Sequence, residues 1–208
     1  MQLADLVSPA TTVVLTQECQ KGVIGDLSLL PALTASARET GMIANVGRIV
    51  ATGRAAGCGV LHCIAATRAD RRGASMNAPL FAGTAKAPVT LLPGSEATEL
   101  VDGIEAADSD LFSTRIGGLS PVNGTDAPTL LRNLAAKTVV ITGVSTNVAI
   151  PNATFDCVNA GFNVVIARDA ITGHPADYTD VIIKNTLSLV AKICTADELV
   201  EIWTSSGS

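Results

Sequence analysis

Polar residues follow two apolar, β-branched runs of the sequence, at the points where the runs end. Glu18 and Gln20 come after the run from Thr11 to Thr16, and a polar turn follows the run from Thr138 to Val144. In open α/β sheets, ligands bind beyond the carboxyl ends of the strands, where the strand order reverses. We therefore expect Glu18 and Ala149, the residue at which the turn ends, to flank one pocket.

The turn opens a helix that we expect from Asn147 to Ala160. Ser145 and Asn147 are N-cap residue types, and the unpaired N–H groups of such a helix start point at whatever lies above the sheet. A hydrolase could hold its nucleophile here, but the methyl group of Ala149 cannot attack a carbonyl. Cys157 lies roughly 12 Å further along the helix axis and cannot reach the same point.

Apolar runs alternate with helix-length segments along the whole chain, which predicts an α/β fold. We expect a three-layer α/β/α, Rossmann-like domain that spans residues 1–208 and contains a mostly parallel sheet of five or six strands. The expected strands are Thr11–Thr16, Gly59–Ala65, Thr138–Val144, Asn163–Ala167 and, at an edge, Ala191–Cys194. The expected helices are Leu33–Ala56, Ala127–Ala135, Asn147–Ala160 and Tyr178–Val190.

Composition excludes several classes of function. The chain has 208 residues, of which 48% are hydrophobic, and a net charge of −5 without a basic run, so nucleic acid is not an expected partner. The first residues resemble neither a signal peptide nor a membrane span, which predicts a cytoplasmic protein. Five cysteines without a C-x-x-C pair, and two histidines outside any metal-binding spacing, predict neither a metal site nor a disulfide framework.

The segment from Ala66 to Asp110 is rich in Gly, Ala, Pro and Arg and lacks periodicity. Long irregular segments of this kind are usually functional loops or subunit contacts. Arg68 and Asn77 follow the second expected strand, so they could reach a ligand beyond it. The same loop could also support a homo-oligomer, a dimer or a tetramer.

Three stretches of the chain resemble the isochorismatase-like hydrolase superfamily, which includes nicotinamidases and other cysteine hydrolases. They are VVLTQECQKGV, STRIGGLSPVNGTDAPTLLRNL, and TGVSTN followed by FDCVNAGFNVVIARDA, and the resemblance runs from Thr12 to about Trp203. The family triad consists of an aspartate, a lysine and a cysteine. Glu18 stands at the position of the aspartate, Arg115 at or within one residue of the lysine, and Ala149 at that of the cysteine.

The resemblance implies a hydrolase of a small, anionic metabolite that needs no cofactor. Isochorismatase-type members hydrolyse a vinyl ether with a carboxylic acid and no cysteine, a role that falls to Glu18, while Arg115 would hold a substrate carboxylate. The N–H groups of Ser145 and Ala149 would form the family's oxyanion hole, beside a cis peptide bond at Val144–Ser145. The substrate-binding candidates are Gln20, Arg68, Asn77, Ser120, Ser145 and Asn147.

Three alternatives stay open at this point. Glu18 and Arg115 could form a plain ion pair that braces two loops. The chain could be an amidase of the cysteine-hydrolase type in which Ala149 replaces the nucleophile. It could also be a non-catalytic member that uses the same fold for small-molecule binding or assembly.

Overall fold

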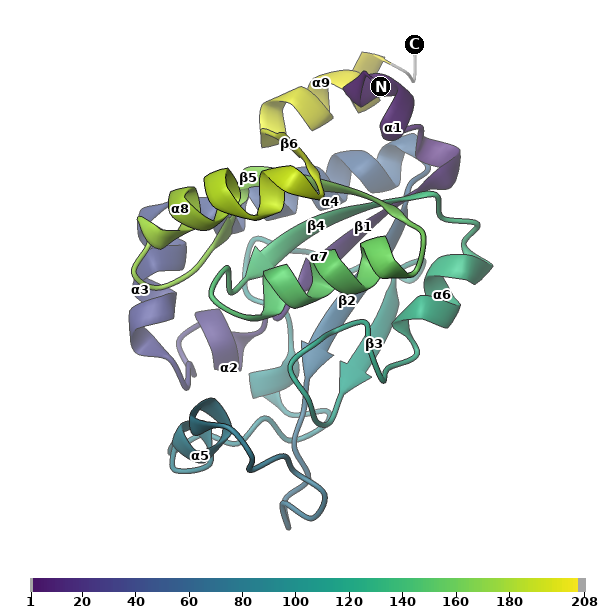
Figure 1. The fold of residues 1–208 in the computed structure, drawn as a ribbon. Helices are drawn as coiled ribbons and strands as arrows, with labels where there is room; N and C mark the ends of the chain where they lie inside the picture. The colour runs from purple at the N-terminus through teal and green to yellow at the C-terminus, as the bar shows by residue number, and fades with distance from the viewer. Residues whose placement is uncertain (1, 206–208) are drawn as a thin grey trace.

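The computed structural model describes residues 2–205, which form a parallel β-sheet with helices on both faces (Figure 1). The strands are β1 (Thr12–Gln17), β2 (Gly59–Ala65), β3 (Leu111–Arg115), β4 (Thr138–Val144), β5 (Asn163–Thr172) and β6 (Lys192–Cys194). Among these residues the sheet has six strands in the order β3-β2-β1-β4-β5-β6, and every neighbouring pair is parallel. The predicted α/β fold class is confirmed.

The helices cover the sheet on both faces because successive strand residues point to opposite sides. On β1, Val14 packs with α3, α4 and α9, whereas Val13 and Leu15 pack with α6, α7 and α8. The helices are α1 (Leu3–Leu6), α2 (Lys21–Ile24), α3 (Pro31–Glu39), α4 (Met42–Ala56), α5 (Pro79–Thr84), α6 (Ala127–Asn133), α7 (Ala149–Asn159), α8 (Tyr178–Asn185) and α9 (Ala196–Ser205). Short 3₁₀ turns cover Pro9–Thr11, Glu96–Thr98 and Leu187–Leu189.

Two helix predictions need correction. The segment expected as one helix from Leu33 to Ala56 is two helices, α3 and α4, because the chain turns at Gly41, whose φ of 68° is left-handed. The helix expected from Tyr178 to Val190 ends at Asn185 and continues only as a 3₁₀ turn. The strand expected to end at Ala167 extends to Thr172.

The sheet order places the switch point, where the order in which strands are added to the sheet reverses, between β1 and β4. The chain adds β2 and β3 on one side of β1, and later adds β4, β5 and β6 on the other. Figure 1 shows α5 beyond the carboxyl ends of β2 and β3, separated from the main body of the sheet. The ends of β1 and β4 therefore meet at the point where open α/β sheets bind ligands. No helix within residues 2–205 is long and apolar enough to cross a membrane.

Candidate active site

Glu18 follows the last residue of β1 in a left-handed conformation. Its φ is 48°, and its N–H donates to the carbonyl of Cys63 at the end of β2 (2.8 Å). A residue with a Cβ in this conformation costs about 1–2 kcal/mol relative to the right-handed region. Non-glycine residues held this way often lie at functional sites, because the surrounding structure must enforce the conformation.

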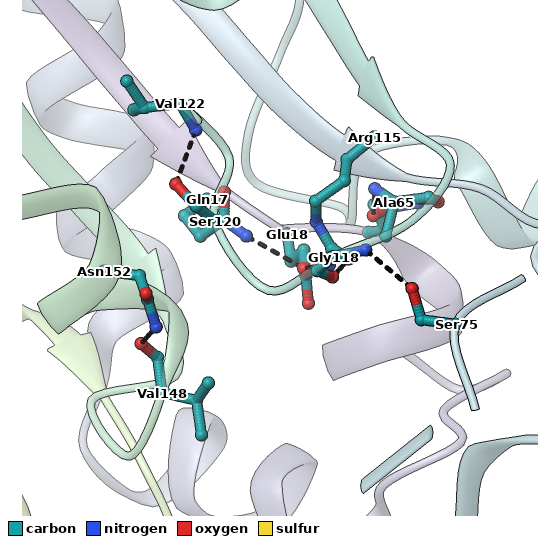
Figure 2. Close-up of polar contacts among 11 residues, drawn as sticks. Gln17, Glu18, Ala65, Ser75, Arg115, Gly118, Ser120, Val122, Val148 and Asn152 are labelled. Atoms are coloured by element: carbon teal, nitrogen blue, oxygen red, sulfur yellow. Dashed lines mark hydrogen bonds and ion pairs between the residues drawn. The ribbon is translucent and has the colours of Figure 1, made fainter. Parts of the chain in front are cut away.

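The two oxygens of the Glu18 carboxylate have different surroundings (Figure 2). Oε1 accepts hydrogen bonds from Gln17 Nε2 (2.9 Å) and from the guanidinium of Arg115, which also donates to the carbonyl of Gly118. Oε2 has no hydrogen-bond partner within the described chain. The Glu18 and Arg115 side chains are 16% and 15% exposed. The carboxylate is thus fixed through one oxygen and leaves the other free.

Gly143 brings the end of β4 against β1 beside this carboxylate. Its φ is 100°, and a Cβ at this position would lie 2.2 Å from the carbonyl oxygen of Gln17. The pairing of β4 with β5 shifts register between Ile141 and Gly143, so the strand bends where the polar turn begins. Only glycine fits this approach without moving the backbone that carries Glu18.

The turn after β4 is fixed by hydrogen bonds to its neighbours. The Asn147 side chain accepts from the N–H and donates to the carbonyl of His174 (2.9 Å each), and the Ser145 carbonyl accepts from Val148 and Ile150. The Val144–Ser145 peptide bond is cis. Ala149 is the first residue of α7, and neither its N–H nor that of Ser145 has an acceptor within the described chain.

A cavity of about 410 Å³, here called the main cavity, joins these groups. Glu18, Arg115, Ser145, Asn147 and Ala149 all line it, and the sequence analysis named each of them as a site candidate. A smaller side cavity of about 140 Å³ adjoins the main cavity and shares Glu18, Leu29, Leu30, Leu80, Phe81 and Arg115 with it. The structure therefore brings together the predicted acid, the predicted cation and the helix start.

Four other predicted substrate-binding residues line neither cavity. Gln20 is fully buried and exchanges two hydrogen bonds with the backbone of Ala65, so it braces the end of β2. Arg68 forms a paired contact with Asp70, and Asn77 is exposed. The Ser120 hydroxyl donates to Asp156 (2.5 Å) and accepts the N–H groups of Val122 and Asn123, so it shapes the turn.

The sequence analysis missed Gln17 and the apolar wall of the main cavity. Gln17 is 1% exposed, and its amide oxygen has no hydrogen-bond partner among the described residues. A polar residue at the end of an apolar strand is the signal that could have identified it. The wall includes Leu30 and Leu33 near the start of α3 and Phe81 in α5, which is embedded in a segment without periodicity.

No cysteine lines the main cavity among the described residues. Burial, together with the charge of Glu18, raises the pKa of the Cys19 thiol to about 12. Burial likewise raises the pKa of Cys157, on the buried face of α7, to about 12. All five cysteines are buried and free. Thiols of this kind remain protonated near neutral pH and are poor nucleophiles.

A buried polar network links β1, β2, α4 and the residue that precedes β3. The ring of His62 contacts the Thr16 hydroxyl through Nδ1 (2.8 Å) and Asp110 through Nε2 (3.2 Å), while Arg54 donates twice to Asp110. Burial lowers the pKa of His62, and Asp110 opposes this only partly. Burial alone would raise the pKa of Asp110, but the bonds from Arg54, Ala107 and His62 outweigh it and lower that pKa. A neutral imidazole therefore donates to Asp110 and accepts from Thr16.

The fold and the site together define a class of protein. A parallel α/β sheet with a carboxylate after the first strand, a cation at the end of β3 and a helix start across the switch point is the arrangement expected of the isochorismatase-like hydrolases. The isochorismatase domain model matches residues 12–198. The chain belongs to the isochorismatase family.

Individual proteins resemble the chain over part of its sequence or in their fold. The isochorismatase family protein YecD of Escherichia coli O157:H7 is 30% identical over 77 residues, which cover 37% of this chain and 41% of YecD, so the match spans less than half of that protein. A cysteine hydrolase from Pseudomonas syringae pv. phaseolicola superposes with a TM-score of 0.81 at 19% identity, covering 97% of this chain and 96% of that one. An isochorismatase family protein from Desulfovibrio vulgaris gives a TM-score of 0.78 at 19% identity, covering 93% and 98%. These two structures share the fold.

Within the described residues, no group of three or more His, Cys, Asp or Glu side chains is arranged to hold a metal ion.

Proposed function

We propose that this chain hydrolyses a small, anionic metabolite by acid catalysis through Glu18, without a covalent intermediate. The observation that carries the proposal is the asymmetry of the Glu18 carboxylate. Oε1 is held by Gln17 and Arg115, whereas Oε2 has no protein partner and Glu18 lines the main cavity. An acid fixed through one oxygen can present a proton on the other in a defined direction.

Arg115 supports the binding of an anionic substrate. A guanidinium has five N–H donors, and Arg115 donates one from Nη2 to Glu18 and one from Nη1 to Gly118. Its Nε is buried without a partner, so one donor on each of Nη1 and Nη2 remains for a ligand. A substrate carboxylate that binds the remaining donors brings a second negative charge beside Glu18. Two neighbouring carboxylates disfavour simultaneous ionisation, so this substrate favours a proton on Glu18.

The proposed reaction is the hydrolysis of an enol ether. Glu18 Oε2 donates its proton to the enol carbon, which leaves an oxocarbenium ion at the ether carbon. A water molecule adds to that carbon and returns a proton to Glu18, which gives a hemiketal. The hemiketal then breaks the C–O bond of the original ether: its hydroxyl proton passes to the departing oxygen, and an alcohol and a ketone are released. No step uses a thiol, consistent with the methyl group of Ala149.

A second candidate is an amidase of the cysteine-hydrolase type in which Ala149 replaces the nucleophile. The observation that favours it is the pair of unpaired N–H groups at Ser145 and Ala149, because such donors stabilise the oxyanion formed from an amide. On this hypothesis, Ala149→Cys restores hydrolysis of small amides and allows an acyl adduct to be trapped. A third candidate, a non-catalytic binding or assembly protein, predicts ligand binding without turnover in every variant.

One assay panel tests the three candidates. The panel incubates four proteins with isochorismate, other carboxylated enol ethers and small amides. The proteins are the wild type, Glu18→Gln, Ala149→Cys and the exposed control Glu39→Gln. We expect wild type and Glu39→Gln to hydrolyse an enol ether, and Glu18→Gln to lose at least about 10²-fold in kcat, the usual contribution of a general acid. Turnover unchanged in Glu18→Gln removes the proposed acid. Amide hydrolysis confined to Ala149→Cys selects the second candidate.

A further inference from the structure

The wall of the main cavity is apolar almost throughout. Leucines and a proline contribute one side, from the end of the α2–α3 connection and the first turn of α3, and α5 contributes the other. The apolar residues that line the cavity are Leu29, Leu30, Pro31, Ala32, Leu33, Leu80, Phe81, Leu119, Val148 and Ala149. Polar wall groups are confined to the ion pair, the turn at Ser145 and Asn147, and His174.

The charged groups of this wall accommodate one negative charge. Among the described lining residues, Glu18 and Arg115 are the carboxylate and the guanidinium, and they neutralise each other. A ligand with one carboxylate can use the free donors of Arg115. Beyond the ion pair, the polar wall groups are Ser145, Asn147 and His174, so a second carboxylate would meet no further arginine or lysine in the main cavity. Transfer of an unpaired charge into such a largely apolar space is costly. Arg71, a nearby cation, lines the side cavity and not the main one.

Two apolar surfaces face the same space without covering each other. Leu80 of α5 is 41% exposed, and Phe81 beside it is half-buried, whereas Leu33 across the cavity is 6% exposed. Soluble proteins rarely leave apolar side chains together around a hollow unless the hollow binds a ligand. A ligand body between these surfaces would remove both from water.

We propose that the main cavity takes a small monocarboxylate whose atoms beyond the carboxylate and the reacting enol ether are apolar, either a branched alkyl chain or a single aromatic ring. The carboxylate binds Arg115, and the apolar body lies between Leu33 and Phe81. This inference rests on the proposed function for the role of Arg115, and it narrows the substrate from any small anion to an amphipathic one. Polyhydroxylated or dianionic metabolites fit this wall poorly.

Calorimetric binding of simple carboxylates to the whole chain tests the inference. The probes are acetate, butanoate, hexanoate and phenylacetate, with succinate as the dianion and phenylacetamide as the uncharged match. Each added methylene should tighten Kd by about fourfold, because burial of one CH₂ contributes about 0.8 kcal/mol. Phenylacetate should bind more than tenfold tighter than either succinate or phenylacetamide.

Two variants and a control locate the effect. Phe81→Ala and Leu33→Ala should each weaken hexanoate and phenylacetate by about tenfold and leave acetate unchanged. Leu189→Ala, which removes a side chain that is 78% exposed and lines neither cavity, should change none of the affinities. Because the chain-length series is measured first on the wild type, it does not depend on how well either variant folds.

The inference is overturned if succinate binds as tightly as phenylacetate, or if affinity does not grow with chain length. Failure of this inference can be distinguished from failure of the proposed function. A protein that binds the series but hydrolyses no enol ether refutes the acid mechanism and supports the amphipathic site. A protein that hydrolyses a polar dianionic enol ether but does not bind the carboxylate series supports the acid mechanism and refutes the amphipathic site.

Discussion

The ion pair between Glu18 and Arg115 should couple the two side chains measurably in the folded protein. Breaking a buried pair by removing one partner costs about 3–5 kcal/mol. Since both side chains keep about one-sixth of their surface exposed and border a cavity open to water, we expect a lower cost, about 2 kcal/mol for Glu18→Gln or Arg115→Gln. The double variant should lose less stability than the two single variants lose together. Urea denaturation at pH 7 should give a coupling free energy of about 1–2 kcal/mol.

An exposed pair on the surface provides the matched control. Arg168 and Asp180 lie 2.9 Å apart, but their side chains are 52% and 75% exposed. A double-mutant cycle on Arg168 and Asp180 should give a coupling free energy of less than about 0.5 kcal/mol, and this coupling should vanish in 1 M salt. A Glu18–Arg115 coupling no larger than that of the control would refute the reasoning, because the guanidinium would then not hold the carboxylate in solution.

Two further predictions concern the framework around the site. Because the pKa of buried His62 is lowered in the folded protein, the unfolded chain takes up this proton first as the pH falls below about 6.5, so the free energy of unfolding should decrease from pH 7 to pH 5. Thermal unfolding of His62→Gln across this range should show a smaller dependence of stability on pH. An equal dependence in both proteins would exclude His62 as the cause. Gly143→Ala should destabilise the fold by more than about 2 kcal/mol, because its φ is 100° and the new methyl group meets the Gln17 backbone. The control Gly94→Ala, at a left-handed position with open space around it, should cost about 1 kcal/mol. Equal losses in the two variants would show that the contact with the Gln17 backbone does not matter.

The sequence predicted the strands that are buried on both faces. β2 and β4 have the expected bounds, and β1 differs by one residue at each end, because buried parallel strands are continuous apolar runs. β3 escaped prediction because it lies at the sheet edge and mixes exposed and buried residues. Its end nevertheless carries Arg115, which was placed only through the family resemblance.

The candidate site was predictable where backbone topology determines it. Glu18 and Ala149 follow neighbouring parallel strands, so the switch-point rule brings them together. The cavity wall was not predictable, because Leu80 and Phe81 belong to a short helix whose position depends on tertiary contacts. The role of Gln17 depends on the left-handed turn at Glu18, which brings two consecutive side chains into hydrogen-bond contact.

The strand order also has a consequence for how the molecule folds. β1 is central, and it pairs with β2 on one side but with the much later β4 on the other. Pairings that are distant in sequence form slowly, because a long loop must close before any contact compensates for its entropy. During synthesis, β1 to β3 emerge first and expose the edge of β1 until β4 arrives. The candidate site, which needs residues from both halves, can assemble only after this last central pairing has formed.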